Sequence, residues 1–322
     1  MELKLINGHN QCVFSEEEEK DIVNLVSNGA SVRSVMRKYN ITKKPINRVL
    51  DKYGVDHSRA NFNGFEYNFP DGIYSEEIEK EILELNSSIG LDNDLKRKYN
   101  VNHYYFDNPY TEDKLYTLGF LYADGYVDKD CRISLSLEER DGYILERINN
   151  NLSNEKPVEY IDYSNKHDFG YTYENQHNLT INSKKINTVL QNLGVYNKKS
   201  LILDFPKWLK PEWYPHFIRG VYDGDGSVYL NNYRGKRAVT VTITSTEQFC
   251  KALVDICAKY IGIKAHIYDA SCHNGITKVF TLCGRNVTRK FLDWIYQDAN
   301  IYLQRKYDRY IDYFDINNST VE

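Results

Sequence analysis

The stretch "RGVYDGDGSV" (residues 219–228) carries an aspartate between two glycines where a helix is expected to end. A second stretch, "LGFLYADGYV" (residues 118–127), has the same closing Asp-Gly, 101 positions earlier. Each stretch also carries two small residues four positions apart, which are Gly119 and Ala123, then Gly220 and Gly224. Small residues at this spacing share one helix face and let two backbones approach closely. The pattern therefore predicts two helices that pack against each other along these four residues.

Asp124 and Asp225 come immediately before the last glycine of each stretch. A negative charge in the last turn is opposed by the helix dipole, and two such ends packed together repel each other. A divalent cation offsets this repulsion, since carboxylate and carbonyl oxygens are the ligands that Mg²⁺ prefers. Two carboxylates astride an axis, each with a metal, form a site for phosphodiester hydrolysis. We also expect Gly125 and Gly226 to end the helices in the left-handed conformation.

Two further residues of the second stretch have no equivalent in the first. Asp223 aligns with Tyr122, and Arg219 aligns with Leu118. The repeat therefore does not require either of them. We interpret Asp223 as a structural residue or a support for the site, and we assign Arg219 no symmetric role.

The elements predicted around these stretches repeat in order. Each half begins with a Gly-Asp helix and continues with two strands, a helix, two strands and a last helix. The alternating stretch "SVYLNNYRGKRAVTVTIT" (227–244) is typical of a β-hairpin. Two tandem α-β-β-α-β-β-α repeats, at 111–204 and 205–322, predict an α+β fold with pseudo-twofold symmetry.

A separate repeat occupies the first hundred residues. Residues 14–42 and 74–102 align without a gap at about twelve identical positions, and each copy opens with a serine N-cap and acidic residues. The first copy continues into a basic segment, "ITKKPINRVLDKYG" (41–54), which predicts an all-α helix-turn-helix DNA-binding domain at 1–60. A three-helix bundle with a solvated basic face is the alternative. The second copy lacks this segment, so 61–110 is predicted to be a linker and a degenerate unit.

Basic and polar side chains of this segment, and of the hairpin turn in the second half, are candidates for DNA contacts. They are Lys43, Lys44, Asn47 and Arg48 in the first region and Arg234, Lys236 and Arg237 in the second. A solvated hairpin tip is the alternative for the second group.

The composition sets limits on the partners. The chain has 322 residues and a formal net charge of −4, which argues against a protein that coats nucleic acid but permits local basic patches. No apolar run approaches the roughly 18–20 residues of a membrane span, and the N-terminus lacks a signal peptide's features. We expect an intracellular protein without membrane contact, in the cytoplasm of a bacterium or of a phage-infected cell.

The two Gly-Asp stretches resemble the paired motifs of single-chain LAGLIDADG homing endonucleases. The matching segments are "YTLGFLYADGYV" and "HFIRGVYDGDGSV", with further likeness in "NKKSLILDFP", "IYLQRKYDRY" and "YYFDNPYTEDKLY". The resemblance covers roughly residues 103–312. It implies a monomeric enzyme that uses Mg²⁺ or Mn²⁺ to cut both strands of a long, asymmetric DNA site.

The resemblance also implies roles for single residues. Asp124 and Asp225 each bind metal, helped by the carbonyl groups of Ala123 and Gly224. Lys199 and Lys306 lie near the scissile phosphates, for which solvated surface lysines are the alternative. The sheets form a saddle over the major groove. The strand residues that could read bases are Arg132, Ser134, Tyr171, Tyr173, Thr240 and Thr242, and the sequence leaves open which face they occupy.

Two other functions on the same fold stay open from the sequence. A splicing maturase would bind intron RNA, and a DNA-binding regulator would not cleave. Retention of both aspartates favours the nuclease, because proteins that have given up cleavage typically lose at least one of them.

Overall fold

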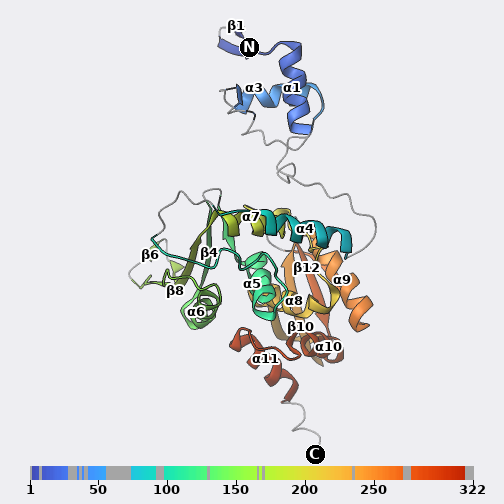
Figure 1. Cartoon of the computed structure of the whole chain (residues 1–322). Coiled ribbons are helices and arrows are strands. Elements are labelled where there is room, and N and C mark those ends of the chain that lie inside the picture. Colours follow the sequence, from blue (N-terminus) through green and yellow to red (C-terminus); the bar gives the residue numbers. More distant parts are fainter. Residues whose placement is uncertain are drawn as a thin grey trace, which may run out of the picture. The chain divides into compact units, whose positions relative to one another are not determined.

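The computed structural model describes most of the chain, in the ranges 2–6, 9–27, 35, 38–39, 43–55, 74–91, 98–128, 131–164, 167–168, 171–233, 236–270 and 277–315. The chain divides into two compact units, Met1–Asp71 and Gly72–Glu322 (Figure 1). None of the helices that the structure describes combines the length and apolarity needed to cross a bilayer.

Over its described residues, the N-terminal unit contains helices α1 (Glu16–Ser27) and α3 (Lys43–Lys52). The predicted start of α1 is confirmed, because Ser15 Oγ accepts from the amide of Glu18 at 3.3 Å and Glu18 Oε2 accepts from the amide of Ser15 at 2.9 Å. This reciprocal pair satisfies two amides at the helix start. The two helices bury Ile22, Ile46 and Leu50 in a small core.

A β-hairpin precedes these helices and was not predicted. Strands β1 (Glu2–Ile6) and β2 (His9–Val13) pair antiparallel, so the unit is not purely α-helical. Each strand is only five residues long, which is too short for a clear alternation of apolar and polar residues in the sequence. The second helix of the helix-turn-helix, expected between Gly29 and about Tyr39, falls mainly on 28–34 and 36–37, which lie outside the described residues.

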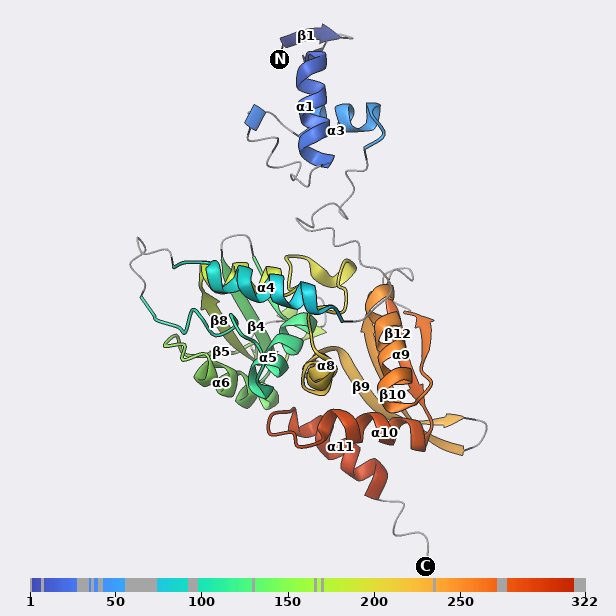
Figure 2. The same cartoon turned by 45° about the vertical axis from the view of Figure 1, so that its right-hand side comes forward.

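The larger unit begins with α4 (Glu76–Ser88), the first helix of the second N-terminal copy. Ser75 caps it as predicted, accepting from the amide of Ile78 at 3.4 Å. The two ends of α4 contact different parts of this unit (Figure 2). Near its start, the amide of Ser75 donates to the carbonyl of Lys207, and near its end, Lys185 Nζ donates to the carbonyl of Ile89 at 2.7 Å. This helix is therefore part of the larger unit.

The two predicted repeats follow with the predicted order of elements. Repeat 1 consists of α5 (Glu112–Ala123), β3 (Tyr126–Val127), β4 (Arg132–Glu138), α6 (Gly142–Asn151), β5 (Glu159–Ile161), β8 (Gln176–Asn182) and α7 (Lys184–Asn192). Repeat 2 consists of α8 (Tyr214–Asp225), β9 (Gly226–Tyr233), β10 (Lys236–Ser245), α9 (Glu247–Ile261), β11 (His266–Asp269), β12 (Lys278–Cys283) and α10 (Arg285–Tyr296). A short pair, β6 (His167–Asp168) with β7 (Tyr171–Thr172), and the last helix, α11 (Gln304–Asp315), lie outside this plan.

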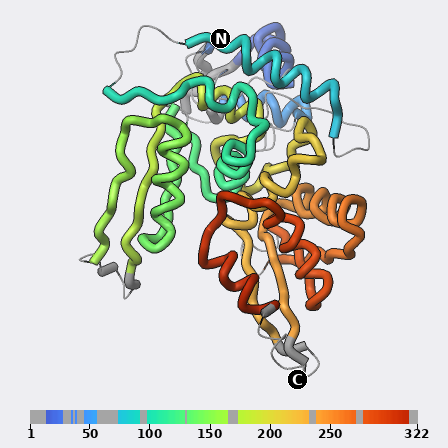
Figure 3. The backbone as a smooth tube through the Cα atoms, turned by 60° about the horizontal axis from the view of Figure 1, so that its bottom comes forward, coloured from blue at the N-terminus to red at the C-terminus, as the bar shows by residue number. Residues whose placement is uncertain are grey.

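The two sheets have the same topology, which confirms the pseudo-twofold α+β prediction. The strand order is β3-β4-β8-β5 in repeat 1 and β9-β10-β12-β11 in repeat 2, and neighbouring strands are antiparallel. Helices α5 and α8 lie between the sheets in Figures 1 and 2. Figure 3 shows repeat 1, in green, and repeat 2, in yellow to red, on the two sides of this central pair.

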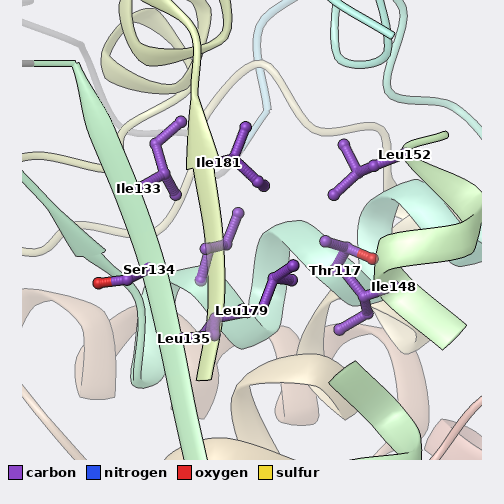
Figure 4. Close-up of a pocket in the computed structure, with 9 residues that line it drawn as sticks. Thr117, Ile133, Ser134, Leu135, Ile148, Leu152, Leu179 and Ile181 are labelled. Atoms are coloured by element: carbon purple, nitrogen blue, oxygen red, sulfur yellow. The ribbon is translucent and has the colours of Figure 1, made fainter. Parts of the chain in front are cut away.

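One face of each sheet packs on helices and the other is open. In repeat 1, Ile133, Leu135 and Leu179 point toward α5 and α6, and Figure 4 shows this interior. Its lining is apolar apart from Thr117 and Ser134, so the polar groups that orient a ligand are scarce there. We therefore interpret it as packed core.

Strand alternation settles which way the predicted base-reading residues point. Arg132 and Ser134 alternate with buried Ile133 and Leu135, so they lie on the open face of the first sheet. By the same alternation, Thr240 and Thr242 lie on the open face of the second sheet, although Thr240 is largely covered. Tyr173 is exposed beyond the end of β7, and the side chain of Tyr171 lies outside the described residues.

Candidate active site at the paired Gly-Asp helices

Helices α5 and α8 meet through their glycines. A methyl group on Gly119 would lie 3.1 Å from the Cα of Gly220 and would overlap the carbonyl oxygen of Phe217. A methyl group on Gly220 would in turn overlap the carbonyl oxygen of Tyr116. The two backbones are therefore in direct contact, and no larger residue fits at either position.

This contact brings the two acidic helix ends together. A methyl group on Gly224 would overlap the Cβ of Ala123 and would lie 3.1 Å from Oδ2 of Asp124. The Asp124 carboxylate thus reaches the last turn of α8, which ends at Asp225. The two predicted carboxylates, one from each repeat, lie at the same end of the helix pair.

The prediction for Gly125 and Gly226 was wrong. Neither takes a positive φ, and Gly226 has φ −92° and ψ 161°. Glycine is needed there for space instead. A Cβ on Gly125 would lie 2.5 Å from the carbonyl oxygen of Leu121, and one on Gly226 would overlap Tyr222. The chain turns so sharply from helix into strand that a side chain would collide with the turn before it.

Protein atoms surround the carboxylate pair even though both side chains remain partly exposed. Burial raises the pKa of Asp225 to about 6, and the neighbouring Asp124 carboxylate adds to the rise. Burial also raises the pKa of Asp124, against the opposing charges of Lys306 and Lys199. The protein therefore holds two carboxylates whose negative charges are unfavourable in the absence of further cations.

Lys199 and Lys306 are buried beside this pair, which rules out the alternative of solvated surface lysines. Lys199 Nζ donates to the carbonyl of Gly125 at 2.5 Å, and Lys306 Nζ donates to the equivalent carbonyl of Gly226 at 2.6 Å. Each lysine thus binds the carbonyl of the glycine that follows its own repeat's aspartate. Two cations at two helix C-termini also oppose the unfavourable dipole there.

The two lysines differ in their further contacts. Lys306 Nζ also donates to two carbonyls of the last turn of α8, those of Tyr222 and Asp223, both at 2.7 Å. Burial lowers the pKa of Lys306 to about 8 and also lowers the pKa of Lys199, while nearby carboxylates oppose both shifts. The repeat 2 lysine is therefore the more firmly held of the two.

Asp223 supports the junction of the helices from inside. Its side chain is buried, and Oδ2 accepts from the hydroxyl of Tyr116 on α5 and from the amide of Leu303, each at 2.8 Å. Burial raises the pKa of Asp223 to about 6, opposed by the charge of Lys306. The sequence interpretation of Asp223 as a support agrees with these contacts, but it did not identify Tyr116.

Arg219 has a structural role that the sequence analysis missed. It is fully buried and donates to the carbonyls of Ile301 and Ile295, at 2.9 and 2.6 Å, and to Glu112 at 2.6 Å. Glu112 begins α5, so this ion pair joins the two repeats. A charged residue directly beside the interface glycine, where the first copy has Leu118, was the available signal.

Metal ligands can be assigned only in part. Over the part of the chain that the structure describes, no three His, Cys, Asp or Glu side chains gather as a metal cluster. Asp124 and Asp225 lie at the helix ends, next to the main chain of Ala123 and Gly224. The carbonyl of Gly224 lies 3.5 Å from Lys306 Nζ, so a cation there would approach a buried positive charge.

The predicted DNA contacts outside the helix pair are described only partly. Arg48 is exposed on α3, and Asn47 is half-buried. Lys43 and Lys44 belong to α3, and Lys236 and Arg237 belong to β10, but their side chains, and all of Arg234, lie outside the described residues.

In comparisons with known proteins, one family model matches part of the chain. Residues 212–296 match the family model of the LAGLIDADG-like domain. No curated protein matches the chain.

Solved structures of several meganucleases are distantly similar to the chain. I-SmaMI bound to uncleavable DNA is 14% identical with a TM-score of 0.44, over 66% of this chain and 91% of that one. I-LtrWI, described as a LAGLIDADG homing endonuclease bound to target DNA, is 10% identical with a TM-score of 0.45, over 65% and 91%. Residues 212–296 of repeat 2 are thus similar to the LAGLIDADG-like domain, and repeat 1 has the same order of elements and the same Gly-Asp helix.

Proposed function

We propose that the chain is a site-specific DNA endonuclease that hydrolyses one phosphodiester bond in each strand of a long, asymmetric duplex site. The meeting of Asp124 and Asp225 at one end of the α5–α8 pair carries this proposal. One carboxylate from each of two similar repeats is the arrangement expected for two equivalent cuts. The differences between the repeats favour a target whose two halves differ.

The donor set fits a hard divalent cation such as Mg²⁺ or Mn²⁺. Two carboxylates with raised pKa values gain from a cation, and Mg²⁺ is commonly held by one or two carboxylates with water and substrate phosphates completing its shell. Asp124 and Asp225 would hold it, with the carbonyls of Ala123 and Gly224 alongside. When bound, such an ion supplies Lewis-acid stabilisation of charge on phosphate oxygens.

Lys199 and Lys306 would act on the same charge from the protein side. Their ammonium groups lie at equivalent places beneath the helix ends and interact with both aspartates. Fixed positive charges in a partly desolvated site stabilise negative charge that develops on a phosphate. We propose this role for both lysines, together with holding the helix ends in place.

DNA would lie across the open faces of the two sheets, and the N-terminal unit would lengthen the contact. Alternate side chains on an open antiparallel face are spaced to meet base edges in a major groove. Exposed Arg48 on α3 would contact DNA from the N-terminal unit, with the basic residues that flank it in the sequence. Because the N-terminal unit is linked to the larger unit, binding of one unit raises the effective concentration of the other at the DNA, which increases the affinity of the whole chain.

The test is digestion of phage and bacterial genomic DNA with the full chain and Mg²⁺, with fresh ends mapped by sequencing. Ends that recur at one locus would identify the site. Asp124→Asn and Asp225→Asn should each abolish double-strand cutting and leave binding to that site intact, because the amide keeps the shape but not the charge. Asp255→Asn changes an exposed carboxylate on α9, a helix that packs on the covered side of the second sheet, and is a matched control that should still cut.

Other outcomes would contradict the proposal. Cutting that survives in both aspartate variants would remove the carboxylate pair from the mechanism. Tight binding to one RNA without cutting of DNA would indicate a splicing maturase. Specific binding to DNA without cutting at any divalent metal concentration would indicate a regulator.

A further inference from the structure

The open faces of the two sheets are chemically different. The register makes the comparison direct, since Tyr126–Ser134 in repeat 1 and Ser227–Thr242 in repeat 2 are equivalent cross-strand pairs. Along the central strand, Ser134 and Ser136 of β4 correspond to Thr242 and Thr244 of β10. Each serine of repeat 1 is thus a threonine in repeat 2, which adds one methyl group.

The strands next to β4 and β10, which are β8 and β12, also differ: the side chain is polar in repeat 1 and apolar in repeat 2. Asn178 lies opposite Ser136 in repeat 1, and Val279 lies opposite Thr244 in repeat 2. The hydroxyl of Thr281, beside Val279, donates to the carbonyl of Val279 at 3.4 Å, which leaves its methyl group for the open face. The face of repeat 2 therefore presents methyl groups where repeat 1 presents polar atoms.

Repeat 1 instead carries a connected polar face. Ser136 Oγ donates to Asn178 Oδ1 at 3.1 Å, and Asn178 Nδ2 lies 3.4 Å from Thr180 Oγ1. Arg132 is more than half exposed in its side chain and occupies the place of Thr240 in the other sheet. Gln176 continues the same face at the far end of β8. These are amide and guanidinium groups, and the open face of repeat 2 has neither in its two central strands over the described side chains.

We propose that this difference divides the reading of the target: repeat 2 recognises its half-site through thymine methyl groups, and repeat 1 recognises its half-site through hydrogen bonds to purine edges. The proposal rests on the proposed DNA-binding function. Its chemical reason is that threonine methyls pack on the C5 methyl of thymine, whereas arginine pairs with guanine O6 and N7 and asparagine or glutamine with adenine N6 and N7.

The experiment uses the full chain and the duplex recovered from the mapping above, with binding measured by fluorescence anisotropy at fixed salt and with EDTA to prevent cutting. Deoxyuridine replaces thymidine in one half-site at a time, which removes the C5 methyl and nothing else. In a second set, 7-deazapurines replace the purines of one half-site at a time. Deoxyuridine should weaken binding about fivefold in the repeat 2 half only, and 7-deazapurines should weaken it in the repeat 1 half.

Paired variants connect these losses to residues. Thr242→Ser removes the methyl, so it should weaken binding to the natural duplex and abolish the response to deoxyuridine at the base it contacts. Thr242→Val keeps the methyl and removes the hydroxyl, so the response should persist. Ser134→Thr is the reciprocal change in repeat 1. The Thr242→Ser change and the deoxyuridine replacement together form a double-mutant cycle. Losses of binding free energy that do not add in this cycle indicate direct contact between the protein methyl and the DNA methyl.

The outcomes separate this inference from the proposed function. Equal losses in both halves, or a deoxyuridine response unchanged by Thr242→Ser, would overturn the division of reading while site-specific binding remained. Failure to recover any specifically bound duplex would overturn the proposed function and this inference with it.

Discussion

At the scale of residues, the candidate site holds two carboxylates close together, and their negative charges destabilise the folded state. Asp225 is held with a pKa of about 6, above its ordinary value, because protein atoms and Asp124 surround it. The folded state therefore favours the protonated form. The destabilisation is complete when pH exceeds about 6, shrinks as pH falls through about 6, and is absent below the carboxyl's unfolded value.

Asp225→Asn should accordingly stabilise the protein in EDTA. We expect about 1 kcal/mol at pH 7.5, a value reduced from the full pKa shift because the side chain is partly exposed. The gain should diminish as the pH of the thermal melt is lowered through about 6. Mg²⁺ should raise the melting temperature of the parent chain more than that of the variant. A variant that is less stable than the parent at every pH would contradict this reading of the site.

The lysine pair allows a second comparison at this scale. Lys306 binds three close carbonyls where Lys199 binds one, so removing the ammonium group leaves more buried acceptors unpaired. Lys306→Met should lower the free energy of unfolding by about 3 kcal/mol, and Lys199→Met by about 1 kcal/mol, in urea denaturation. Equal losses would mean that the extra carbonyl contacts add nothing.

At the scale of elements, the α5–α8 contact is the joint on which the site depends. Gly119→Ala would force apart two backbones that touch, and we expect a loss of about 3 kcal/mol together with loss of cutting. Gly90→Ala is the control, because a methyl group there meets nothing within 4 Å. The measurement is chemical denaturation of both variants beside the parent. Tolerance of alanine at Gly119 would show that the helices can separate freely.

The sequence predicted these elements well for a physical reason. In each Gly-Asp stretch, small residues four positions apart define the helix face that packs. Because the two stretches are repeats, their aspartates occupy equivalent positions, so the pairing of Asp124 with Asp225 could be predicted. The Tyr116–Asp223 bond, the partners of Arg219 and the carbonyl partners of the lysines could not, because these contacts join groups far apart in the sequence that no periodicity relates. The left-handed turn expected at Gly125 was wrong because glycine can serve close packing as well as positive φ.

At the scale of the whole molecule, the two compact units should be separable. Removal of residues 1–71 should leave the melting temperature of the larger unit unchanged and weaken binding to the target about a hundredfold, with a shorter footprint. Cutting of the site at high protein concentration should survive. An unchanged footprint would show that the N-terminal unit does not read DNA.

A longer truncation, which removes residues 1–97, should be compared with the truncation of residues 1–71. It deletes α4 as well, leaving Lys185 without two carbonyl partners and uncovering the surface on which Ile78 and Ile82 pack. The melting temperature should then fall clearly. If both truncations melt alike, α4 contributes nothing to the larger unit.

The packing of α4 on the larger unit determines which parts of the chain can be replaced independently. Val26, in the core of the first copy, corresponds to Asn86 in the second, where the amide accepts from Asn192 at 2.9 Å instead. Helix α4 packs on the larger unit, so deleting it removes contacts on which that unit depends. A rearrangement that replaces residues 1–71 can therefore leave the larger unit intact, whereas one that also removes α4 takes away part of that unit's own packing.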